Sequence, residues 1–449
     1  MFRNFQTTQV ATYQKNMQHV VIIGNGIAGV TAARHIRKLS DKKITIISAE
    51  TDYFFSRTAL MYVYMGHMRW TDIEPYEHWF WKKNRLELKK AYVSKIETSA
   101  KTLHFKEGGN MQYDQLIIAS GSSTNTFGWE GLNSKGVVGM VTKQDLEQIE
   151  KYAPNNKECR SAVLVGGGLI GVELAEMLRT RNIDVTFLIR EENFWDGVLP
   201  EGEAAMISRH VKSHGVDLRN HTNLDKIVAD SDGKVRAVIT KETGEEIACD
   251  MVGICTGVKP NISFLAESGI ETDRGILVNR KLETNIKDVY AIGDCAQQRE
   301  AIGNRKPVEA VWYTGRMMGE TVAQTICGNP FEYNPGHWFN SAKFFDIEYQ
   351  TYGWVFSKKK DYEAHFHWHH EDDTKCITIA YHKDSMQFLG INTFGIRMKH
   401  EVFDRWLTEK RDVNFVMEHL KKANFDPEFY TQYESQIQRS FQQQQPINA

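Results

Sequence analysis

Two stretches of the chain share one pattern of apolar and polar positions. Residues 19–50 and residues 161–192 each read as an apolar strand, a glycine-rich turn, a helix and a second apolar strand. Strands that alternate with helices in this way indicate parallel α/β architecture. Shorter strand-like stretches follow, at residues 102–105, 115–119, 251–255 and 289–292. The pattern therefore predicts an α/β fold with two Rossmann-like units of the three-layer ββα type.

The pattern changes after about residue 333. Strand-like pieces at 341–345, 362–368, 376–381 and 388–391 are followed by a helical pattern at 401–422. This region has no glycine-rich nucleotide signature, so it predicts a separate α+β domain. The polar tract at 442–445 is typical of a disordered tail, and residues 1–18 are interpreted as a flexible arm.

Composition narrows the class of protein. A chain of 449 residues is too long for one ordinary core, which predicts two or three domains. The formal net charge of -2 does not favour nucleic-acid binding, and no apolar run has the length of a transmembrane helix. Six scattered cysteines without any CxxC pair indicate buried thiols in a reducing compartment, so we expect a cytoplasmic protein.

The first glycine-rich turn reads Gly24-Asn25-Gly26-Ile27-Ala28-Gly29 and directly follows a strand. Gly24 permits a tight turn, Gly26 lets the backbone approach a pyrophosphate, and Gly29 lets helix and strand pack closely. The helix N-terminus then offers free N–H groups to phosphates. Glu50 ends the second strand, where a carboxylate can accept hydrogen bonds from ribose hydroxyls. Such turns also serve packing alone, but this context favours a dinucleotide site.

The second glycine-rich turn reads Gly166-Gly167-Gly168-Leu169-Ile170-Gly171 and opens a helix after another strand. The same physical reasons apply to Gly166, Gly168 and Gly171. Two well-separated turns of this kind in one chain are far more specific than either alone. They predict two bound dinucleotides.

Three further motifs point to one family. Residues 113–121 read YDQLIIASG, residues 256–261 read TGVKPN, and residues 289–296 read VYAIGDCA. With the two glycine-rich turns, they make residues 19–327 resemble the pyridine nucleotide-disulfide oxidoreductase superfamily. The chain is most similar to the branch that holds ferredoxin and rubredoxin reductases, the flavin part of nitrite reductases, and apoptosis-inducing factor.

The resemblance implies two cofactors, FAD and either NADH or NADPH. It assigns an FAD-binding domain to residues 19–135 and 285–330, an NAD(P)H-binding domain to 136–284, and an interface domain to 331–449. Ser120 and Gly121 fall in the motif where the chain crosses between the domains. Asp294 matches a residue that binds the flavin ribityl chain, and Glu173 matches a glutamate beside the nicotinamide.

The chain also departs from the thiol-dependent relatives. They carry one or two cysteines on the helix after the first unit, and here Thr58 takes that position. Thiol–disulfide exchange needs a thiolate, so this chemistry has no obvious carrier. Relatives in the electron-transfer branch have a lysine near Tyr62, which leaves a lysine–glutamate pair with Glu173 in doubt. Arg57 is a candidate for the FAD phosphates or for contact with the flavin.

Three other features have more than one interpretation. Trp312 is either a tryptophan against the flavin or nicotinamide, as the resemblance implies, or an ordinary core aromatic. Arg190 favours NADPH, whereas Glu191 and Glu192 oppose it. The histidines of residues 365–370 alternate along a predicted strand, and we expect a solvent-exposed strand end rather than a metal site.

These observations predict an enzyme that moves a hydride from NAD(P)H to FAD and electrons onward to a one-electron carrier such as ferredoxin or rubredoxin. No redox-active disulfide is needed. Two alternatives stay open: quinone reduction, and an NADH-sensing flavoprotein that recruits a partner. The sequence also leaves open a homodimer.

Overall fold

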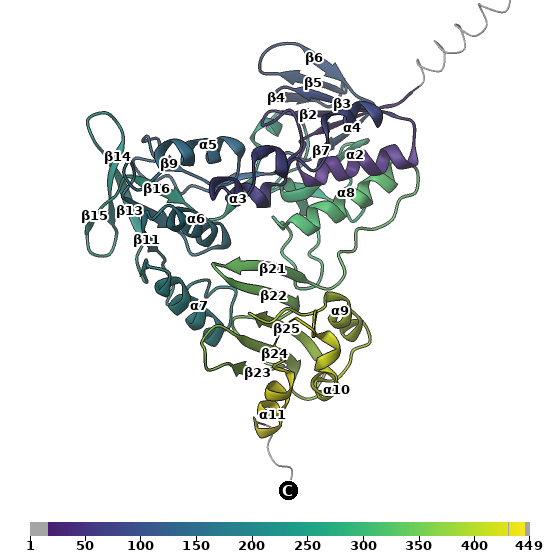
Figure 1. The fold of residues 1–449 in the computed structure, drawn as a ribbon. Coiled ribbons are helices and arrows are strands. Elements are labelled where there is room, and N and C mark those ends of the chain that lie inside the picture. The colour runs from purple at the N-terminus through teal and green to yellow at the C-terminus, as the bar shows by residue number, and fades with distance from the viewer. Residues whose placement is uncertain (1–16, 430, 445–449) are drawn as a thin grey trace, which may run out of the picture. The chain divides into compact units, whose positions relative to one another are not determined.

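The computed structural model describes residues 17–429 and 431–444 of the chain (Figure 1). These residues form two compact units. Unit 1 holds the described residues up to Asn125 together with Val141–Glu147 and Val258–Pro335. Unit 2 holds Thr126–Met140, Gln148–Gly257 and the described residues from Gly336 onward. The expected N-terminal arm lies outside the described residues, apart from positions 17 and 18.

Unit 1 is built on a five-stranded parallel sheet in the order β19-β7-β1-β2-β3. The strands are β1 (His19–Ile23), β2 (Lys43–Ser48), β3 (Leu86–Lys90), β7 (Gln115–Ile118) and β19 (Val289–Ala291). The inner strands are nearly continuous apolar runs because both faces of the sheet are covered. The strand order reverses between β1 and β7. In open α/β sheets, ligands bind at the carboxyl ends of the strands beside such a reversal.

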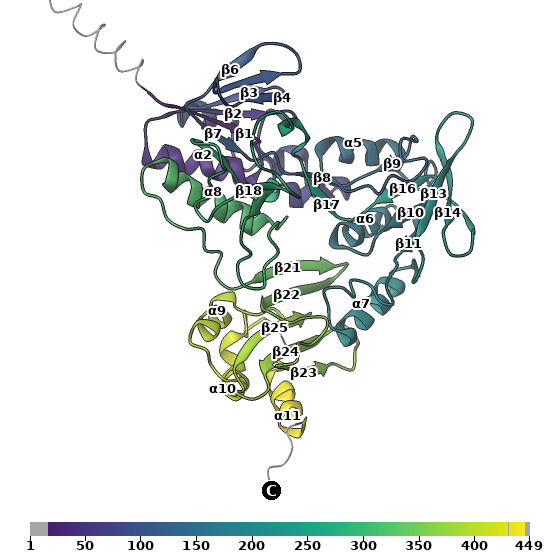
Figure 2. The ribbon, with the colours of Figure 1, turned by 180° about the vertical axis from the view of Figure 1, so that it is seen from behind.

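Helices cover one face of this sheet and a smaller sheet covers the other, as Figures 1 and 2 show. The helices are α2 (Ile27–Leu39) and α8 (Trp312–Ile326), and the smaller antiparallel sheet contains β4 (Val93–Glu97), β5 (Thr102–Phe105) and β6 (Asn110–Gln112). These three layers confirm the predicted ββα type of unit. Shorter elements of unit 1 are α3 (Leu60–Tyr64), α4 (His78–Lys83), β8 (Ser122–Thr124), β17 (Val258–Pro260), β18 (Ile276–Val278) and β20 (Ala296–Gln298).

Unit 2 repeats this plan. Its parallel sheet has the order β12-β11-β10-β16-β9, and β13-β14-β15 form a small antiparallel sheet. The strands are β9 (Val137–Val138), β10 (Ser161–Val165), β11 (Asp184–Leu188), β12 (Val216–Arg219), β13 (Leu224–Ala229), β14 (Val235–Thr240), β15 (Glu246–Ala248) and β16 (Met251–Ile254). The helices are α5 (Lys143–Tyr152, whose first turn belongs to unit 1), α6 (Leu169–Thr180) and α7 (Glu201–Ser213).

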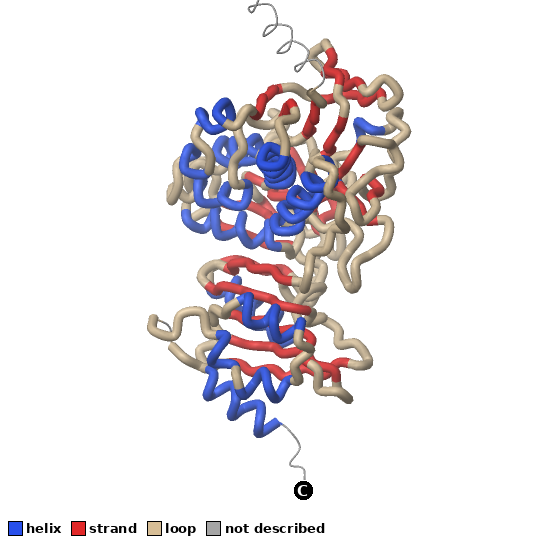
Figure 3. The backbone as a smooth tube through the Cα atoms, turned by 90° about the vertical axis from the view of Figure 1, so that its right-hand side faces the viewer, coloured by secondary structure: helices blue, strands red, loops and turns tan. Residues whose placement is uncertain are grey.

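The C-terminal part of unit 2 is an antiparallel sheet with helices packed against it, visible in Figure 3 as stacked red strands beside blue helices. Its strand order is β21-β22-β25-β24-β23. The strands are β21 (Phe339–Phe344), β22 (Ile347–Gly353), β23 (Glu363–His369), β24 (Cys376–His382) and β25 (Phe388–Phe394). The helices are α9 (His400–Thr408), α10 (Val413–Glu418) and α11 (Glu434–Gln444). The predicted α+β character of this region is confirmed.

Two expectations for this region were wrong, and one strand was not anticipated. The helical pattern at 401–422 is divided into α9, α10 and a short 3-10 helix at Leu420–Ala423. Lys410 adopts a left-handed backbone (φ +51°), and the Asp412 side chain caps α10 by accepting the N–H groups of Asn414 and Phe415. The polar tract at 442–445 is helical through residue 444, since α11 buries Ile437 and Phe441 on the apolar side of the same helix. Strand β22 was not anticipated, although its buried residues partly alternate.

Helix α7 joins the nucleotide-type part of unit 2 to the C-terminal sheet. The buried Glu203 accepts a hydrogen bond of 2.8 Å from Asn392 Nδ2 on β25. Burial raises the pKa of Glu203 to about 7, although hydrogen bonds from Thr378 and Asn392 oppose this. Arg209 forms two 2.7 Å bonds with Asp373, in the turn between β23 and β24. Polar contacts therefore fix this helix to the sheet at several points.

The compact units do not follow the expected domain boundaries. Residues 258–284, expected with the NAD(P)H-binding segment, belong to unit 1, and the C-terminal region belongs to the same unit as the second glycine-rich turn. Among the helices in the described parts of the chain, none combines the length and the apolar character needed to cross a bilayer.

The packing of α2 on α8 makes a prediction about two glycines of α8. A Cβ on Gly319 would lie 2.6 Å from the Ala28 carbonyl oxygen, whereas a Cβ on Gly315 would lie no closer than 3.6 Å to a neighbouring atom. Both changes to alanine gain helix propensity equally. We expect Gly319→Ala to lower the free energy of unfolding by about 1–3 kcal/mol through overpacking. Gly315→Ala, the matched control, leaves it unchanged or raises it. Equal thermal unfolding of the two variants would contradict this account of the helix pair.

Candidate functional site

The first glycine-rich turn lies at the carboxyl end of β1, beside the end of β7. A Cβ on Gly24 (φ +114°) would overlap the Ala119 carbonyl group, with its carbon only 2.7 Å away. A Cβ on Gly29 would overlap the Gly24 carbonyl oxygen. Gly26, the N-cap of α2, differs from both, because a Cβ there would meet no atom within 4 Å. The turn is therefore closed by backbone on one side and open at the helix N-terminus.

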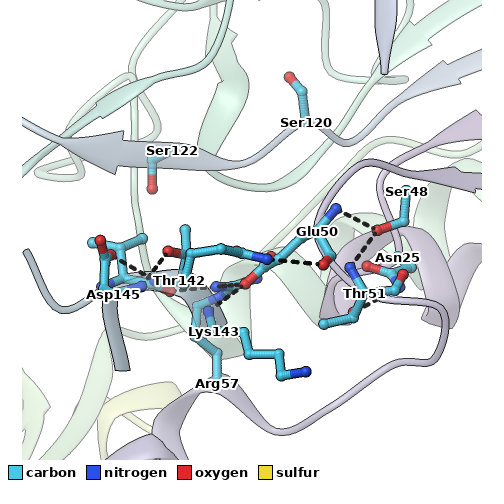
Figure 4. Close-up of polar contacts among 12 residues, drawn as sticks. Asn25, Ser48, Glu50, Thr51, Arg57, Ser120, Ser122, Thr142, Lys143 and Asp145 are labelled. Carbon is cyan, nitrogen blue, oxygen red and sulfur yellow. Dashed lines mark hydrogen bonds and ion pairs between the residues drawn. The ribbon is translucent and has the colours of Figure 1, made fainter. Parts of the chain in front are cut away.

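Buried hydrogen bonds fix the chain around this turn. Asn25 Nδ2 donates to the carbonyl oxygen of Thr51 at 3.0 Å and contacts its hydroxyl at 3.2 Å. Ser48 Oγ accepts the N–H groups of Glu50 and Thr51 at 3.2 and 3.3 Å. Figure 4 shows these side chains grouped beside Glu50. Asn25 thus joins the first turn to the segment that follows β2.

Glu50 lies two residues beyond the end of β2, rather than at its last residue as expected. Its carboxylate accepts hydrogen bonds from Arg57 Nη1 at 3.0 Å, from Arg57 Nη2 at 2.6 Å and from the backbone N–H of Lys143 at 2.8 Å. A carboxylate offers about four acceptor positions. One position is thus left for a further donor, such as a single ribose hydroxyl.

Arg57 also donates to the carbonyl oxygen of Val141, which connects it to the segment before α5. That segment is held by Asp145, whose Oδ2 accepts the N–H groups of Val141 and Thr142 at 2.8 Å each. Figure 4 shows Arg57 and Lys143 meeting at Glu50. Glu50 and Arg57 are seven residues apart in sequence. The structure brings both into contact with the segment at the start of α5, which is distant in sequence.

The crossover motif and the VYAIGDCA motif also meet in unit 1. Ser122 Oγ donates to Asp294 Oδ2 at 2.7 Å, and Ser120 Oγ donates to the carbonyl oxygen of Asn261 at 2.7 Å. Gly121 has a left-handed backbone, with φ of +68°. Burial raises the pKa of Asp294, although the Ser122 hydrogen bond and the Arg57 charge lower it. Ser122, which follows Gly121, therefore links the crossover motif to Asp294 in the VYAIGDCA motif.

The second glycine-rich turn, in unit 2, resembles the first, because two of its glycines are crowded by neighbouring atoms and its N-cap glycine is not. A Cβ on Gly166 (φ +106°) would lie 2.8 Å from the Cys255 carbonyl oxygen, and one on Gly171 would overlap the Phe187 ring. Gly168 is the N-cap of α6, and a Cβ there would have one neighbour, at 3.8 Å. Both turns thus leave room at the position where a phosphate would meet a helix N-terminus.

The residues after β11 bear on the choice between NADH and NADPH. Ile189 is buried, and its Cγ2 atom lies 3.0 Å from where a Cβ on Gly167 would stand. Arg190 is exposed, and its Nε lies 2.8 Å from Glu191 Oε1. The single basic side chain at this position therefore already pairs with a carboxylate. This arrangement favours neither dinucleotide.

Glu173 lies on α6, two residues after Gly171. Burial and the nearby Glu176 raise its pKa to about 7, although Lys343 opposes this rise. Lys343 Nζ itself bonds Glu176 Oε1 at 2.7 Å. A carboxyl group with this pKa exchanges a proton near neutral pH, which is a property of general acids and bases.

The other expected site residues lie in unit 1. Tyr62 is half-buried on α3, with its ring 6.3 Å from that of His67. Trp312 is the first residue of α8, with its ring 5.4 Å from Tyr313 and 6.0 Å from the Arg316 guanidinium. Thr58 is exposed, and its hydroxyl lies 3.3 Å from that of Ser56. No contact among the described residues decides between the two interpretations of Trp312.

None of the cysteines, all of which lie in described parts of the chain, is paired in a disulfide. Burial raises the pKa of three thiols to about 12, those of Cys159, Cys249 and Cys255. It also raises the pKa of Cys295 and Cys376. Thiols held in the neutral form are poor nucleophiles.

The histidines of residues 365–370 are less exposed than expected. His367 Nδ1 lies 2.9 Å from the Thr378 hydroxyl, and His369 Nε2 lies 2.8 Å from Asp373. Burial lowers the pKa of His365 and His367 to about 4. The expectation of a solvent-exposed strand end was wrong for these two residues.

Sequence reasoning missed several residues that shape the first site, among them Asn25, Ser122, Val141 and Lys143. Asn25 had a signal, because it stands inside the glycine motif. Lys143 had none, since its contribution is a backbone N–H group, which no residue type reveals.

Comparisons with known proteins give a matching family and several relatives. The model of the pyridine nucleotide-disulphide oxidoreductase family matches residues 18–319. The NADH oxidase of Methanocaldococcus jannaschii is 30% identical over 73% of this chain and 74% of its own. The rubredoxin-NAD(+) reductase of Acinetobacter baylyi is 28% identical over 63% of this chain and 72% of its own.

The nitrite reductase [NAD(P)H] of Bacillus subtilis is 29% identical over 63% of this chain, but the match spans 35% of that protein's length. Among solved structures, a covalent complex of putidaredoxin reductase and putidaredoxin matches with a TM-score of 0.78 and 20% identity, over 89% of this chain and 95% of that one. This likeness shows the fold, as expected from the sequence.

The contacts of Glu50 make a prediction about the first site. Glu50→Gln keeps an acceptor for the Lys143 N–H but loses the charge that holds both Arg57 nitrogens. We expect at least about tenfold weaker FAD retention, measured by the flavin fraction after dialysis, since charge-assisted bonds contribute roughly 1.5–3 kcal/mol. Glu87→Gln, which removes an exposed ion pair with Lys43 on the same sheet, is the control. Equal flavin retention in both variants would refute the assignment of Glu50.

Proposed function

Because the chain belongs to the pyridine nucleotide-disulphide oxidoreductase family, we propose that it is an enzyme that passes electrons from NADH or NADPH through bound FAD to a one-electron carrier protein of the ferredoxin or rubredoxin type. The observation that carries this proposal is the pair of glycine-rich turns. Each lies at the carboxyl end of a parallel sheet, and each has an N-cap glycine whose Cβ position is open.

In unit 1 the chain's own residues are suited to FAD. The N–H groups at the start of α2 and the Gly26 backbone would receive the pyrophosphate. Glu50 would accept one ribose hydroxyl, and Arg57, with donors beyond those that bind Glu50 and Val141, would stabilise phosphate charge. Asp294, held by Ser122, would orient the ribityl chain. FAD, when bound, accepts a hydride and releases electrons singly.

In unit 2 the Gly166–Gly171 turn would receive the pyrophosphate of NADH or NADPH. Glu173 is the candidate acid or base of this unit, because its pKa of about 7 lets it hold or release a proton at neutral pH. Tyr62 and Trp312 remain candidates for contact with the flavin or nicotinamide ring. Arg190 is the candidate for the ribose 2′-phosphate of NADPH.

The choice of acceptor rests on the thiol chemistry that the chain lacks. Relatives named as NADH oxidase and as CoA-dependent sulfur oxidoreductase match this chain at similar identity to the rubredoxin and ferredoxin reductases. Thr58 stands where the thiol-dependent members carry a cysteine, and the buried cysteines have raised pKa values. A one-electron carrier needs no thiol. Unpaired cysteines also favour a reducing compartment, so we propose a cytoplasmic location.

Two glycine variants separate the two cofactor sites. Gly26 and Gly168 both have extended backbones that accept valine, and neither Cβ position is crowded by protein. We expect Gly26→Val to fold but to purify without FAD, because its side chain fills the place of a phosphate. Gly168→Val should retain FAD that dithionite reduces, but lose reduction by NAD(P)H.

Far-ultraviolet circular dichroism serves as the folding control for both variants. If Gly26→Val retains its full FAD, the first site has been assigned wrongly. If Gly168→Val loses FAD as well as its reduction by NAD(P)H, the two sites have been divided wrongly.

The second prediction concerns the six cysteines. Single replacement of each by alanine or serine should leave the rate of anaerobic flavin reduction by NAD(P)H near that of the wild type. A buried thiol that is removed costs of order 1 kcal/mol of stability. The measurement is stopped-flow bleaching of the flavin. A replacement that stops electron delivery while FAD stays bound would place the protein with the thiol-dependent reductases instead.

A further inference from the structure

Two histidines and one carboxylate meet at the C-terminal end of α7. His210 is in the last turn of the helix, and His214 follows one turn later as its C-cap. The turn between β21 and β22 brings Asp346 against both. Asp346 Oδ1 lies 2.7 Å from His210 Nε2 and 3.5 Å from His214 Nε2. One ligand atom from each residue lies within 4.8 Å of the others.

The tautomer of His214 is fixed by its own helix. Its Nδ1 atom lies 2.9 Å from the carbonyl oxygen of His210, which has no proton to give. Nδ1 therefore carries the proton, and in the neutral ring Nε2 presents a lone pair to the Asp346 carboxylate. Two acceptors that face each other at 3.5 Å repel unless a positive charge lies between them, supplied either by a proton on Nε2 or by a metal ion. Ligating histidines commonly donate their other N–H to a backbone carbonyl in this way.

The neighbouring residues that the structure describes pack against the histidines and do not form ion pairs with Asp346. The Phe345 ring stacks on His214 with centroids 4.3 Å apart, and Phe345 adopts a left-handed backbone (φ +56°) that a bulky residue rarely takes. Nearby cations are already paired, Arg209 with Asp373 and Lys343 with Glu176. Among the described residues, the two histidines are the basic side chains that pair with Asp346.

The distances suit a small divalent ion. Zinc takes nitrogen ligands at about 2.0–2.1 Å and oxygen ligands at about 2.0–2.2 Å in a tetrahedron, so its ligand atoms lie about 3.4 Å apart. The separation of 3.5 Å from His214 to Asp346 already fits, and the 2.7 Å separation from His210 needs a small opening. Asp346 is 76% exposed, so solvent can supply a fourth ligand.

We propose that His210, His214 and Asp346 form a binding site for a divalent transition-metal ion, with Zn²⁺ as the ion best suited to its two nitrogens and one oxygen. The ion fastens α7, which belongs to the nucleotide-type part of unit 2, to the β21–β22 hairpin of the C-terminal sheet. Its role is structural, and the site stands apart from both glycine-rich turns in sequence and needs neither cofactor.

The test is calorimetric titration of the chelator-treated full-length protein with ZnCl2, together with thermal unfolding with and without the ion. We expect one equivalent to bind and to raise the unfolding temperature. His214→Gln and Asp346→Asn should each weaken binding at least about tenfold and abolish the rise. Asp346 is exposed, so its variant folds even if a histidine variant does not.

The matched controls are His369→Gln, from the histidine-rich strand β23, and His221→Gln, from an exposed pair with Glu192. Both should bind zinc like the wild type. Loss of binding in His369→Gln but not in Asp346→Asn would move the site to β23 and overturn the proposal. Wild-type binding in Asp346→Asn and His214→Gln, or binding only at millimolar zinc, would overturn it as well.

Discussion

The close approach of two backbone segments at the carboxyl edge of the unit 1 sheet determines where the first glycine-rich turn is closed and where it is open. Gly24 and Ala119 come so near that no Cβ fits at position 24. This contact closes one side of the turn and directs the start of α2 toward open space at Gly26. Unit 2 repeats the constraint where Gly166 meets the carbonyl of Cys255. Both openings therefore arise from backbone packing, before any ligand binds.

Charged and polar side chains complete the first site and also limit it. Glu50 holds Arg57 and the first N–H of α5, so most of its acceptor capacity is used within the protein. The site is thereby ordered in advance, which lowers the entropy cost of binding. The cost is a narrower role for Glu50, which has room for about one hydroxyl. The expectation that Glu50 binds the ribose stays a prediction, and its existing hydrogen bonds limit it to about one hydroxyl.

The sequence predicted what local pattern determines. The two strand–turn–helix–strand stretches and the distinct roles of glycines such as Gly24 and Gly29 follow from periodicity and backbone sterics. Prediction from the sequence failed where the structure depends on a long-range contact or on the backbone of a single residue. One left-handed residue, Lys410, divides the C-terminal helical pattern. The meeting of Asp346 with His210 depends on tertiary packing across 136 positions, which no motif records.

Anaerobic titration of the purified protein with NADH or NADPH tests the central claim most directly, because it counts the electrons that each chain accepts. Two dinucleotide sites and one flavin without a redox thiol predict that the flavin absorbance is bleached by one equivalent of reductant. No further equivalent should be consumed. Uptake of a second equivalent per chain, giving a four-electron reduced state, would contradict the account, since a second redox group such as a disulfide would then have to exist.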